Sequence, residues 1–306
     1  MARTLGRLIT AMVTPFDTAG EVDLERAARL AQALVASRSD GVVVNGTTGE
    51  SPTLNAGERL ALLESVRDAL PDHAVVMGTG SYDTAATVAL TREAGQRGAD
   101  AALVVAPYYS KPPQEGLIAH YQAVADVGLP VIIYNIPGRC GVNVSVETQL
   151  RLAAHPGIVG TKEAAGDVEQ TAAICAGAPP GFRVWSGDDS LTLPFLSVGA
   201  YGVVSVVSHV AGDAIRRMVE AFVAGDVHGA MARHHRLMPL FKGLFVSSNP
   251  IAVKAALQHI GFDAGGLRLP LVPLDDQRTR TLHTLLDSLG DLVGLSTGQA
   301  VQAGRA

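Results

Sequence analysis

The sequence is poor in cysteine and lacks long apolar runs. Two cysteines in 306 residues, Cys140 and Cys175, form neither a disulfide framework nor a metal-binding motif. No apolar run approaches the roughly 20 residues that a membrane-spanning helix needs. The N-terminus passes straight into a strand-like segment without the apolar core of a signal peptide. These absences predict a cytoplasmic protein with reduced thiols, no membrane partner, and neither a metal nor another cofactor.

Charge is also scarce. Charged residues make up 17% of the chain, the net charge is −5, and no run of Lys or Arg is present. Nucleic acid and anionic membranes are therefore poor candidates for partners. Hydrophobic residues make up 47%, which is typical of a globular protein, and the chain is long enough to bury a sizeable core.

Short apolar segments alternate with amphipathic ones eight times. Strands are predicted at 8–16, 41–47, 74–80, 101–109, 130–137, 158–162, 182–188 and 202–207, and helices at 23–38, 55–70, 83–97, 114–126, 145–154, 167–175, 190–198 and 212–224. Continuously apolar strands are typical of parallel sheets covered by helices. Eight such units in about 225 residues match the α/β class in the form of a (β/α)₈ TIM barrel. A doubly wound sheet is the alternative, but no G-x-G-x-x-G follows the first strand.

The C-terminal part reads as helices only. We predict helices at 226–240, 251–260 and 275–289, which divides the chain into a barrel, 1–225, and a helical region, 226–306. No linker-like stretch separates the two, so the C-terminal helices should pack on the barrel. The tail from Ser296 onward is predicted to be frayed.

One lysine is placed unusually. Of 24 basic residues only four are Lys, and Lys162 ends an apolar strand among Gly, Thr and Ala. The ammonium form of a lysine is disfavoured in a desolvated pocket, so a free amine becomes available to attack a ketone and form a Schiff base. The alternative is a structural ion pair with a carboxylate such as that of Glu163.

The candidate site residues lie where the predicted strands end, and in a barrel these ends meet at one mouth. They are Thr47, Thr48, Tyr108, Tyr109, Tyr134, Arg139, Lys162, Gly187, Asp188, Asp189, Ser205 and Ser208. The Tyr and Thr hydroxyls could relay protons during imine formation, Thr48 and loop amides could hold one carboxylate, and Arg139 could bind a second.

Each of these residues also has a purely structural alternative. The threonines could satisfy turn amides, the tyrosines could pack at the rim or in the core, and Arg139 could form a surface salt bridge. Asp188 and Asp189 fit a helix N-cap better than a metal site, because no third ligand lies at a suitable spacing.

Several motifs together resemble a known family. They are Gly46-Thr-Thr-Gly-Glu-Ser-Pro-Thr-Leu54, Pro107-Tyr-Tyr-Ser-Lys-Pro-Pro113, Tyr134-Asn-Ile-Pro-Gly-Arg139, Gly160-Thr-Lys-Glu163, Ser186-Gly-Asp-Asp189 and Asn249-Pro-Ile-Ala-Val-Lys254. In this order and spacing they resemble the dihydrodipicolinate synthases, which belong to the pyruvate-dependent class I lyases together with N-acetylneuraminate lyase. The resemblance covers nearly all of residues 5–290. It implies condensation of pyruvate with L-aspartate 4-semialdehyde to 4-hydroxy-tetrahydrodipicolinate, in lysine and diaminopimelate biosynthesis.

The resemblance also implies roles for single residues. Lys162 would form the Schiff base with pyruvate, and Thr47, Tyr109 and Tyr134 would relay protons, with Tyr109 serving the neighbouring subunit. Substrate-binding residues would be Thr48 for the pyruvate carboxylate, Arg139 for the second substrate, and Gly187 and Val204 for the lining of the site. The family's assembly would be a homotetramer, arranged as a dimer of tight dimers.

Arg139 favours this family over its relatives, because lyases acting on sugar acids usually lack it. Two alternatives remain: a lyase acting on a sugar acid or a 4-hydroxy-2-oxo acid, and a barrel that binds a 2-oxo acid without turnover. Cys140, next to Arg139, is either a reactive thiol or a small buried filler.

The chain departs from the family at its lysine-inhibition site. Lysine-sensitive members carry polar or His residues after the Gly-Thr-Thr-Gly-Glu loop and an acidic residue in the third helix. Those positions here are Ala56, Arg59, Tyr82 and Ala86, with only Ser51 and Tyr108 retained. A lysine ammonium would find no carboxylate and would be repelled by Arg59, so we predict weak or absent feedback by lysine.

Overall fold

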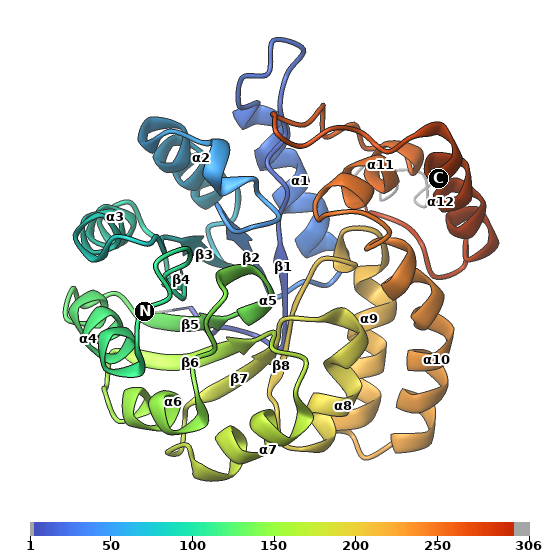
Figure 1. The fold of residues 1–306 in the computed structure, drawn as a ribbon. Helices are drawn as coiled ribbons and strands as arrows, with labels where there is room; N and C mark the ends of the chain where they lie inside the picture. Colours follow the sequence, from blue (N-terminus) through green and yellow to red (C-terminus); the bar gives the residue numbers. More distant parts are fainter. Residues whose placement is uncertain (1–2, 297–306) are drawn as a thin grey trace.

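The computed structural model, which describes residues 3–296, is a closed parallel barrel of eight strands in the order β1 to β8 (Figure 1). The strands are Leu8–Ala11, Gly41–Val44, Ala74–Gly78, Ala101–Val105, Val131–Asn135, Ile158–Glu163, Arg183–Ser186 and Gly202–Ser205. β1 closes the barrel by pairing with β8, where Ile9 aligns with Val204. The predicted (β/α)₈ barrel is thereby confirmed.

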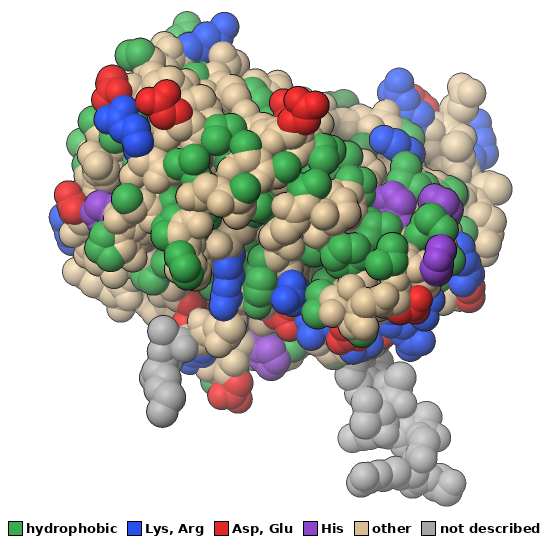
Figure 2. Space-filling view, turned by 90° about the horizontal axis from the view of Figure 1, so that it is seen from below, with side chains coloured by type: hydrophobic (Ala, Val, Ile, Leu, Met, Phe, Trp, Pro, Cys, Tyr) green, Lys and Arg blue, Asp and Glu red, His purple; other side chains and the backbone are tan. Residues whose placement is uncertain are grey.

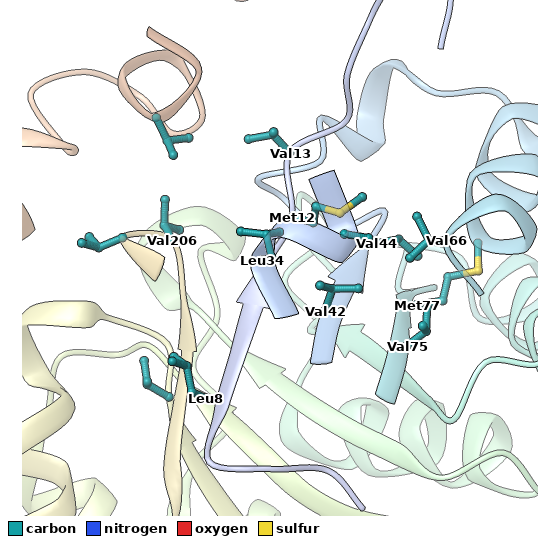
Figure 3. Packing of buried hydrophobic residues seen from close by; sticks show 14 of the residues in the cluster. Leu8, Met12, Val13, Leu34, Val42, Val44, Val66, Val75, Met77 and Val206 are labelled. Carbon is teal, nitrogen blue, oxygen red and sulfur yellow. The ribbon is translucent and has the colours of Figure 1, made fainter. Parts of the chain in front are cut away.

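Two apolar layers explain why these strands are continuously hydrophobic. Residues facing the barrel interior include Val43, Ile132 and Trp185, and they form one core cluster. Their neighbours in sequence face outward and form a second cluster with the helices. Figure 3 shows Val42, Val44, Val75 and Met77 on β2 and β3, lying near Leu34 and Val66 of the covering helices. Both faces of each strand are dry, as expected for a parallel barrel.

The helices surround the sheet as predicted. They are α1 Leu24–Ala36, α2 Ala56–Ala69, α3 Thr84–Gln96, α4 Gln114–Ala125, α5 Pro137–Cys140, α6 Val146–Ala153, α7 Val168–Gly177, α8 Thr192–Ser197 and α9 Ser208–Val223, with 3₁₀ turns η1 at Ser51–Thr53 and η2 at Asp189–Leu191. Asn55 and Glu58 form a capping box at the start of α2, with each side chain bonded to the other residue's backbone amide.

Some predicted strands are longer than the observed ones. β1 ends at Ala11 and not at Phe16, because Phe16 turns away to form an antiparallel bridge with Val22. β4 ends at Val105, so Tyr108 and Tyr109 lie in the following loop, where Pro107 has no N–H to continue the ladder. The short helix α5, which carries Arg139, was not predicted.

The C-terminal helices lie along one side of the barrel. They are α10 Val227–Gly243, α11 Ile251–His259 and α12 Asp276–Ser288, drawn in orange and red in Figure 1. α10 and α11 contact α9, and their buried Leu240 and Val253 belong to the same core cluster as the barrel helices. The division into residues 1–225 and 226–306 stays a prediction. Most of the predicted tail lies outside the described residues.

Two surface properties follow from the described part of the chain. None of its helices is both long and apolar enough to cross a membrane. On the face shown in Figure 2, Lys and Arg side chains are scattered among acidic and hydrophobic ones and form no continuous basic patch.

Candidate active site

Lys162 lies inside the barrel mouth on β6, between Tyr134 of β5 and Trp185 of β7 in the strand register. Its side chain is 5% exposed, and its Nζ lies 4.2 Å from the centre of the Tyr134 ring. Within residues 3–296 the amine has no carboxylate partner. A buried lysine side chain beside an aromatic ring, with no carboxylate partner, suits imine formation.

Glu163 is not the partner of this amine. Because side chains alternate along a strand, Glu163 faces the opposite side of β6. Its buried carboxylate accepts hydrogen bonds from the side chains of Asn135 (3.0 Å), Gln149 (2.9 Å) and Gln170 (3.1 Å), and from the Ala165 amide (2.8 Å). The structural ion pair considered from the sequence is therefore absent, and Glu163 instead ties the back of β6 to β5 and the α6 and α7 region.

Gly187 gives Lys162 the space it needs. A Cβ at position 187 would lie 3.1 Å from Cε of Lys162 and 2.7 Å from Cβ of Ala164. The amide of Gly187 donates to the Glu163 carbonyl at 2.7 Å, which fixes the β7 end beside the lysine. Val204 on β8 is 1% exposed and belongs to the interior cluster that also contains Tyr134, so it can form part of the apolar floor.

Thr47 and Thr48 lie in the turn after β2. Neither of their amides donates a hydrogen bond to a backbone or side-chain atom of residues 3–296. Thr48 is 2% exposed, and its hydroxyl oxygen accepts a hydrogen bond of 2.8 Å from Nδ2 of Asn249. The hydroxyl therefore does not satisfy a turn amide, which was the structural alternative. Two free amides and a hydroxyl form a donor set suited to a carboxylate.

Asn249 was present in the sequence motif but had no role assigned to it. It lies 201 residues from Thr48 in the chain, so no local pattern in the sequence could join the two. It precedes α11 and is 9% exposed, which places a residue of the C-terminal region against the turn that carries both threonines.

Arg139 lies exposed in the last turn of α5, directly after the strand that carries Tyr134. Its guanidinium forms no ion pair or hydrogen bond with any described residue, so the surface salt bridge considered from the sequence is absent. A guanidinium on the rim with no acidic partner remains available to a substrate carboxylate.

Tyr109 does not reach the site of its own chain. Its side chain is 93% exposed, and its backbone has a φ of 70°, in the left-handed region that a tyrosine rarely adopts. Within residues 3–296 no hydrogen bond joins the hydroxyls of Thr47, Tyr109 and Tyr134. Its neighbour Tyr108 behaves as rim packing, with its ring 5.5 Å from that of Tyr82 in an edge-to-face arrangement.

The paired aspartates support the neighbouring strand ends. Asp188 caps η2 by accepting from the Ser190 amide, as predicted. Asp189 is fully buried and accepts from the amides of Val206 (2.9 Å) and Val207 (3.1 Å), and from the Ser205 hydroxyl. Burial raises the pKa of Asp189 to about 6. These bonds fix the chain that follows β8.

Cys140 is the buried filler and not the reactive thiol. It is 3% exposed, and burial raises its pKa to about 11, although the Arg139 charge acts in the opposite direction. The thiol therefore stays protonated near neutral pH and is a poor nucleophile.

A barrel whose mouth presents a buried lysine amine, an adjoining tyrosine ring, carboxylate-binding amides and a rim arginine is typical of a class I lyase that works through a Schiff base. A model of the "Dihydrodipicolinate synthetase family" matches residues 4–289. The chain belongs to this family.

Similar proteins agree in sequence and in fold. The 4-hydroxy-tetrahydrodipicolinate synthase of Heliobacterium modesticaldum is 54% identical over 287 residues, covering 93% of this chain and 96% of that protein. The same enzyme of Symbiobacterium thermophilum is 53% identical, covering 94% and 99%. The crystal structure of the Cyanidioschyzon merolae enzyme with lysine bound is 44% identical and covers 94% and 99%, with a TM-score of 0.92.

Proposed function

We propose that the chain condenses pyruvate with L-aspartate 4-semialdehyde to form 4-hydroxy-tetrahydrodipicolinate, a step of lysine biosynthesis. The observation that carries this proposal is the Lys162 amine, buried at a barrel mouth without a carboxylate partner, in a chain that is more than half identical to enzymes of this name. The amine attacks C2 of pyruvate, water leaves, and the resulting imine withdraws electrons so that C3 can lose a proton. The enamine carbon then bonds to the aldehyde carbon, whose oxygen takes up a proton. The amino group of the semialdehyde displaces Lys162 from the imine carbon, which closes the ring and frees the lysine.

The surrounding residues take the roles expected from the family. Thr48 and the free amides of the same turn bind the pyruvate carboxylate, and Arg139 binds the carboxylate of the semialdehyde. Tyr134 and Thr47 move protons to and from the carbinolamine, and Gly187 and Val204 line the pocket. Tyr109 completes the relay from a neighbouring subunit, which explains why its side chain is 93% exposed in the single chain.

The proposed assembly is a homotetramer built as a dimer of tight dimers, because the relay needs Tyr109 from a second copy. We also propose that the enzyme works in the cytoplasm. Both cysteines are free thiols in the structure, which suits that compartment.

A coupled assay tests the substrate assignment. The purified protein is given pyruvate together with aspartate semialdehyde or with a panel of 2-oxo sugar acids. We expect turnover with the semialdehyde, and we expect Arg139→Ala to raise its KM by about 10-fold or more, since a charged pair is lost. Turnover only in the sugar-acid panel, or imine formation without any turnover, would replace the proposal by one of its two alternatives.

A further inference from the structure

We propose that Asn249, supplied by the C-terminal region, is a positioning residue that sets the direction of the Thr48 hydroxyl. This inference deepens the proposed function, because it rests on Thr48 as the group that holds the pyruvate carboxylate. It also gives residues 226–296 a part in the site beyond covering one side of the barrel.

The first step concerns the hydrogen of the Thr48 hydroxyl. A threonine hydroxyl has one hydrogen to donate and can accept two hydrogen bonds. Nδ2 of Asn249 donates to Oγ1 of Thr48 at 2.8 Å and so occupies one acceptor position. Within residues 3–296 the hydroxyl hydrogen has no acceptor, although the side chain is only 2% exposed. A buried donor without a partner is costly, which indicates that the site is built for an incoming acceptor such as a carboxylate.

The Asn249 carboxamide has one donor atom, Nδ2, and this is the atom that faces Thr48. Its other polar atom, Oδ1, is buried and has no hydrogen-bond partner among the described residues. Asn249 therefore does not owe its orientation to bonds made by Oδ1. Among residues 3–296, the side chain of Asn249 makes one hydrogen bond, and that bond is to Thr48.

Contacts between Glu50 and the C-terminal region keep Asn249 and Thr48 facing each other. Two residues after Thr48, Oε1 of Glu50 lies 2.7 Å from Nζ of Lys254 on α11, and the two side chains are 0% and 4% exposed. The amide of Arg268 donates to Oε2 of Glu50 at 3.0 Å, and Nζ of Lys254 also donates to the Gly266 carbonyl at 2.6 Å.

A buried ion pair of this kind adds little net stability but fixes one arrangement of the groups around it. The C-terminal region thus grips the turn at Glu50 and at Thr48. A further contact comes from the segment after β1, where the Thr14 hydroxyl donates to the Gly49 carbonyl at 2.7 Å. These contacts hold the turn independently of Asn249, and the bond from Asn249 acts on the Thr48 hydroxyl itself.

Two substitutions of Asn249 distinguish an effect on the direction of the Thr48 hydroxyl from the loss of a contact with Thr48. Asn249→Ala removes the donor. Asn249→Asp keeps the shape, but an ionised carboxylate only accepts, so the Thr48 hydrogen would turn toward it and away from pyruvate. Asn55→Asp is the matched control: the charge change is the same, at the N-cap of α2, where Asp caps as well as Asn does.

The measurement is the pyruvate concentration that gives half-maximal imine trapping by borohydride, followed on the peptide that contains Lys162. We expect Asn249→Asp to raise this pyruvate concentration by roughly 10- to 100-fold, and Asn249→Ala to raise it by less. In both variants kcat should change far less than KM for pyruvate. The melting temperature of each variant is measured alongside.

A double-mutant cycle asks whether Asn249 acts through Thr48. In a Thr48→Val background, Asn249→Ala should have no further effect on the half-saturating pyruvate concentration. An equal effect in both backgrounds, or the same pyruvate dependence for Asn249→Asp and Asn55→Asp, would overturn the inference. Trapping needs no aldehyde, so a wrong second substrate leaves this test intact. A wild-type protein that traps no pyruvate would instead refute the proposed function.

Discussion

At the scale of single residues, the chemistry depends on space and on unpaired groups around Lys162. The amine has an aromatic ring beside it and no acidic partner among residues 3–296, and Arg139 on the rim is likewise unpaired. A buried amine without an acidic partner is unusual in a folded chain, where buried polar groups are normally satisfied. This amine and the exposed Arg139 guanidinium lie at one end of the barrel, and together they are the strongest structural sign of a substrate site.

Gly187→Ala is predicted to disturb this arrangement. The new methyl group would lie 3.1 Å from Cε of Lys162, so the lysine must shift. A misplaced nucleophile lowers the rate steeply, and we expect kcat to fall by about 10- to 100-fold while stability falls by about 1–3 kcal/mol. Gly266→Ala serves as control, because its Cβ would meet nothing within 4 Å. Unchanged turnover in Gly187→Ala would show that the lysine tolerates the contact.

Lysine itself is predicted to be a weak effector or none. Arg59 donates to the carbonyls of Ser51 (2.8 Å) and Leu54 (3.0 Å), which holds its positive charge at the turn that the family resemblance associates with lysine inhibition. The Cyanidioschyzon merolae relative was crystallised with lysine bound. A steady-state assay should show no inhibition at sub-millimolar lysine, and clear inhibition there would contradict the prediction.

At the scale of elements, buried titratable groups hold the loops around β8 in place. His209, near the start of α9, accepts from the Val13 amide at its Nε2 (3.1 Å) and donates from Nδ1 to the Val206 carbonyl (2.7 Å). Burial lowers its pKa to about 4. Because this pKa is depressed below 6.5, the stability that neutral His209 contributes is present above pH 6.5 and is lost as the pH falls to 4.

His209→Gln is predicted to flatten this acid sensitivity, since an amide can make both bonds without titrating. The free energy of unfolding of the wild type should drop between pH 6.5 and 4 by roughly 3 kcal/mol more than that of the variant, from about 1.4 kcal/mol per pKa unit. Asp189 has the opposite effect on the free energy of unfolding. Because its pKa is raised, its contribution to stability is full below about pH 4 and is lost as the pH rises to about 6. Urea unfolding at several pH values measures the difference, with the exposed His228→Gln as control. Parallel curves for wild type and His209→Gln would contradict it.

The sequence predicted elements well but not the contacts between distant ones. The eight-fold alternation and the strand-end residues Thr48, Tyr134 and Lys162 were visible because hydrophobic period and position are local properties. Asn249 was not visible as a site residue, because its contact with Thr48 spans 201 positions. The helix α5 was missed because a four-residue Pro-Gly-Arg-Cys segment carries no helical periodicity.

At the scale of the whole molecule, one chain does not contain the complete proposed relay. Tyr109, at 93% exposure, needs a second copy to be of use. Mixing two inactive variants tests this. Co-expressed Tyr109→Phe and Lys162→Ala chains should recover about a quarter of the wild-type activity, because half of randomly paired dimers are hybrids with one intact site of two. Activity no greater than the sum of the separate variants would show that Tyr109 does not act across subunits.

Imine formation between Lys162 and pyruvate can be measured directly. The protein is treated with pyruvate and borohydride, digested, and analysed by mass spectrometry. We expect a gain of about 72 Da on the peptide that contains Lys162, the mass of pyruvate after loss of its keto oxygen and reduction of the imine. Peptides carrying Lys111, Lys242 or Lys254 should be unchanged. No gain on the Lys162 peptide, or an equal gain on all four, would contradict the account.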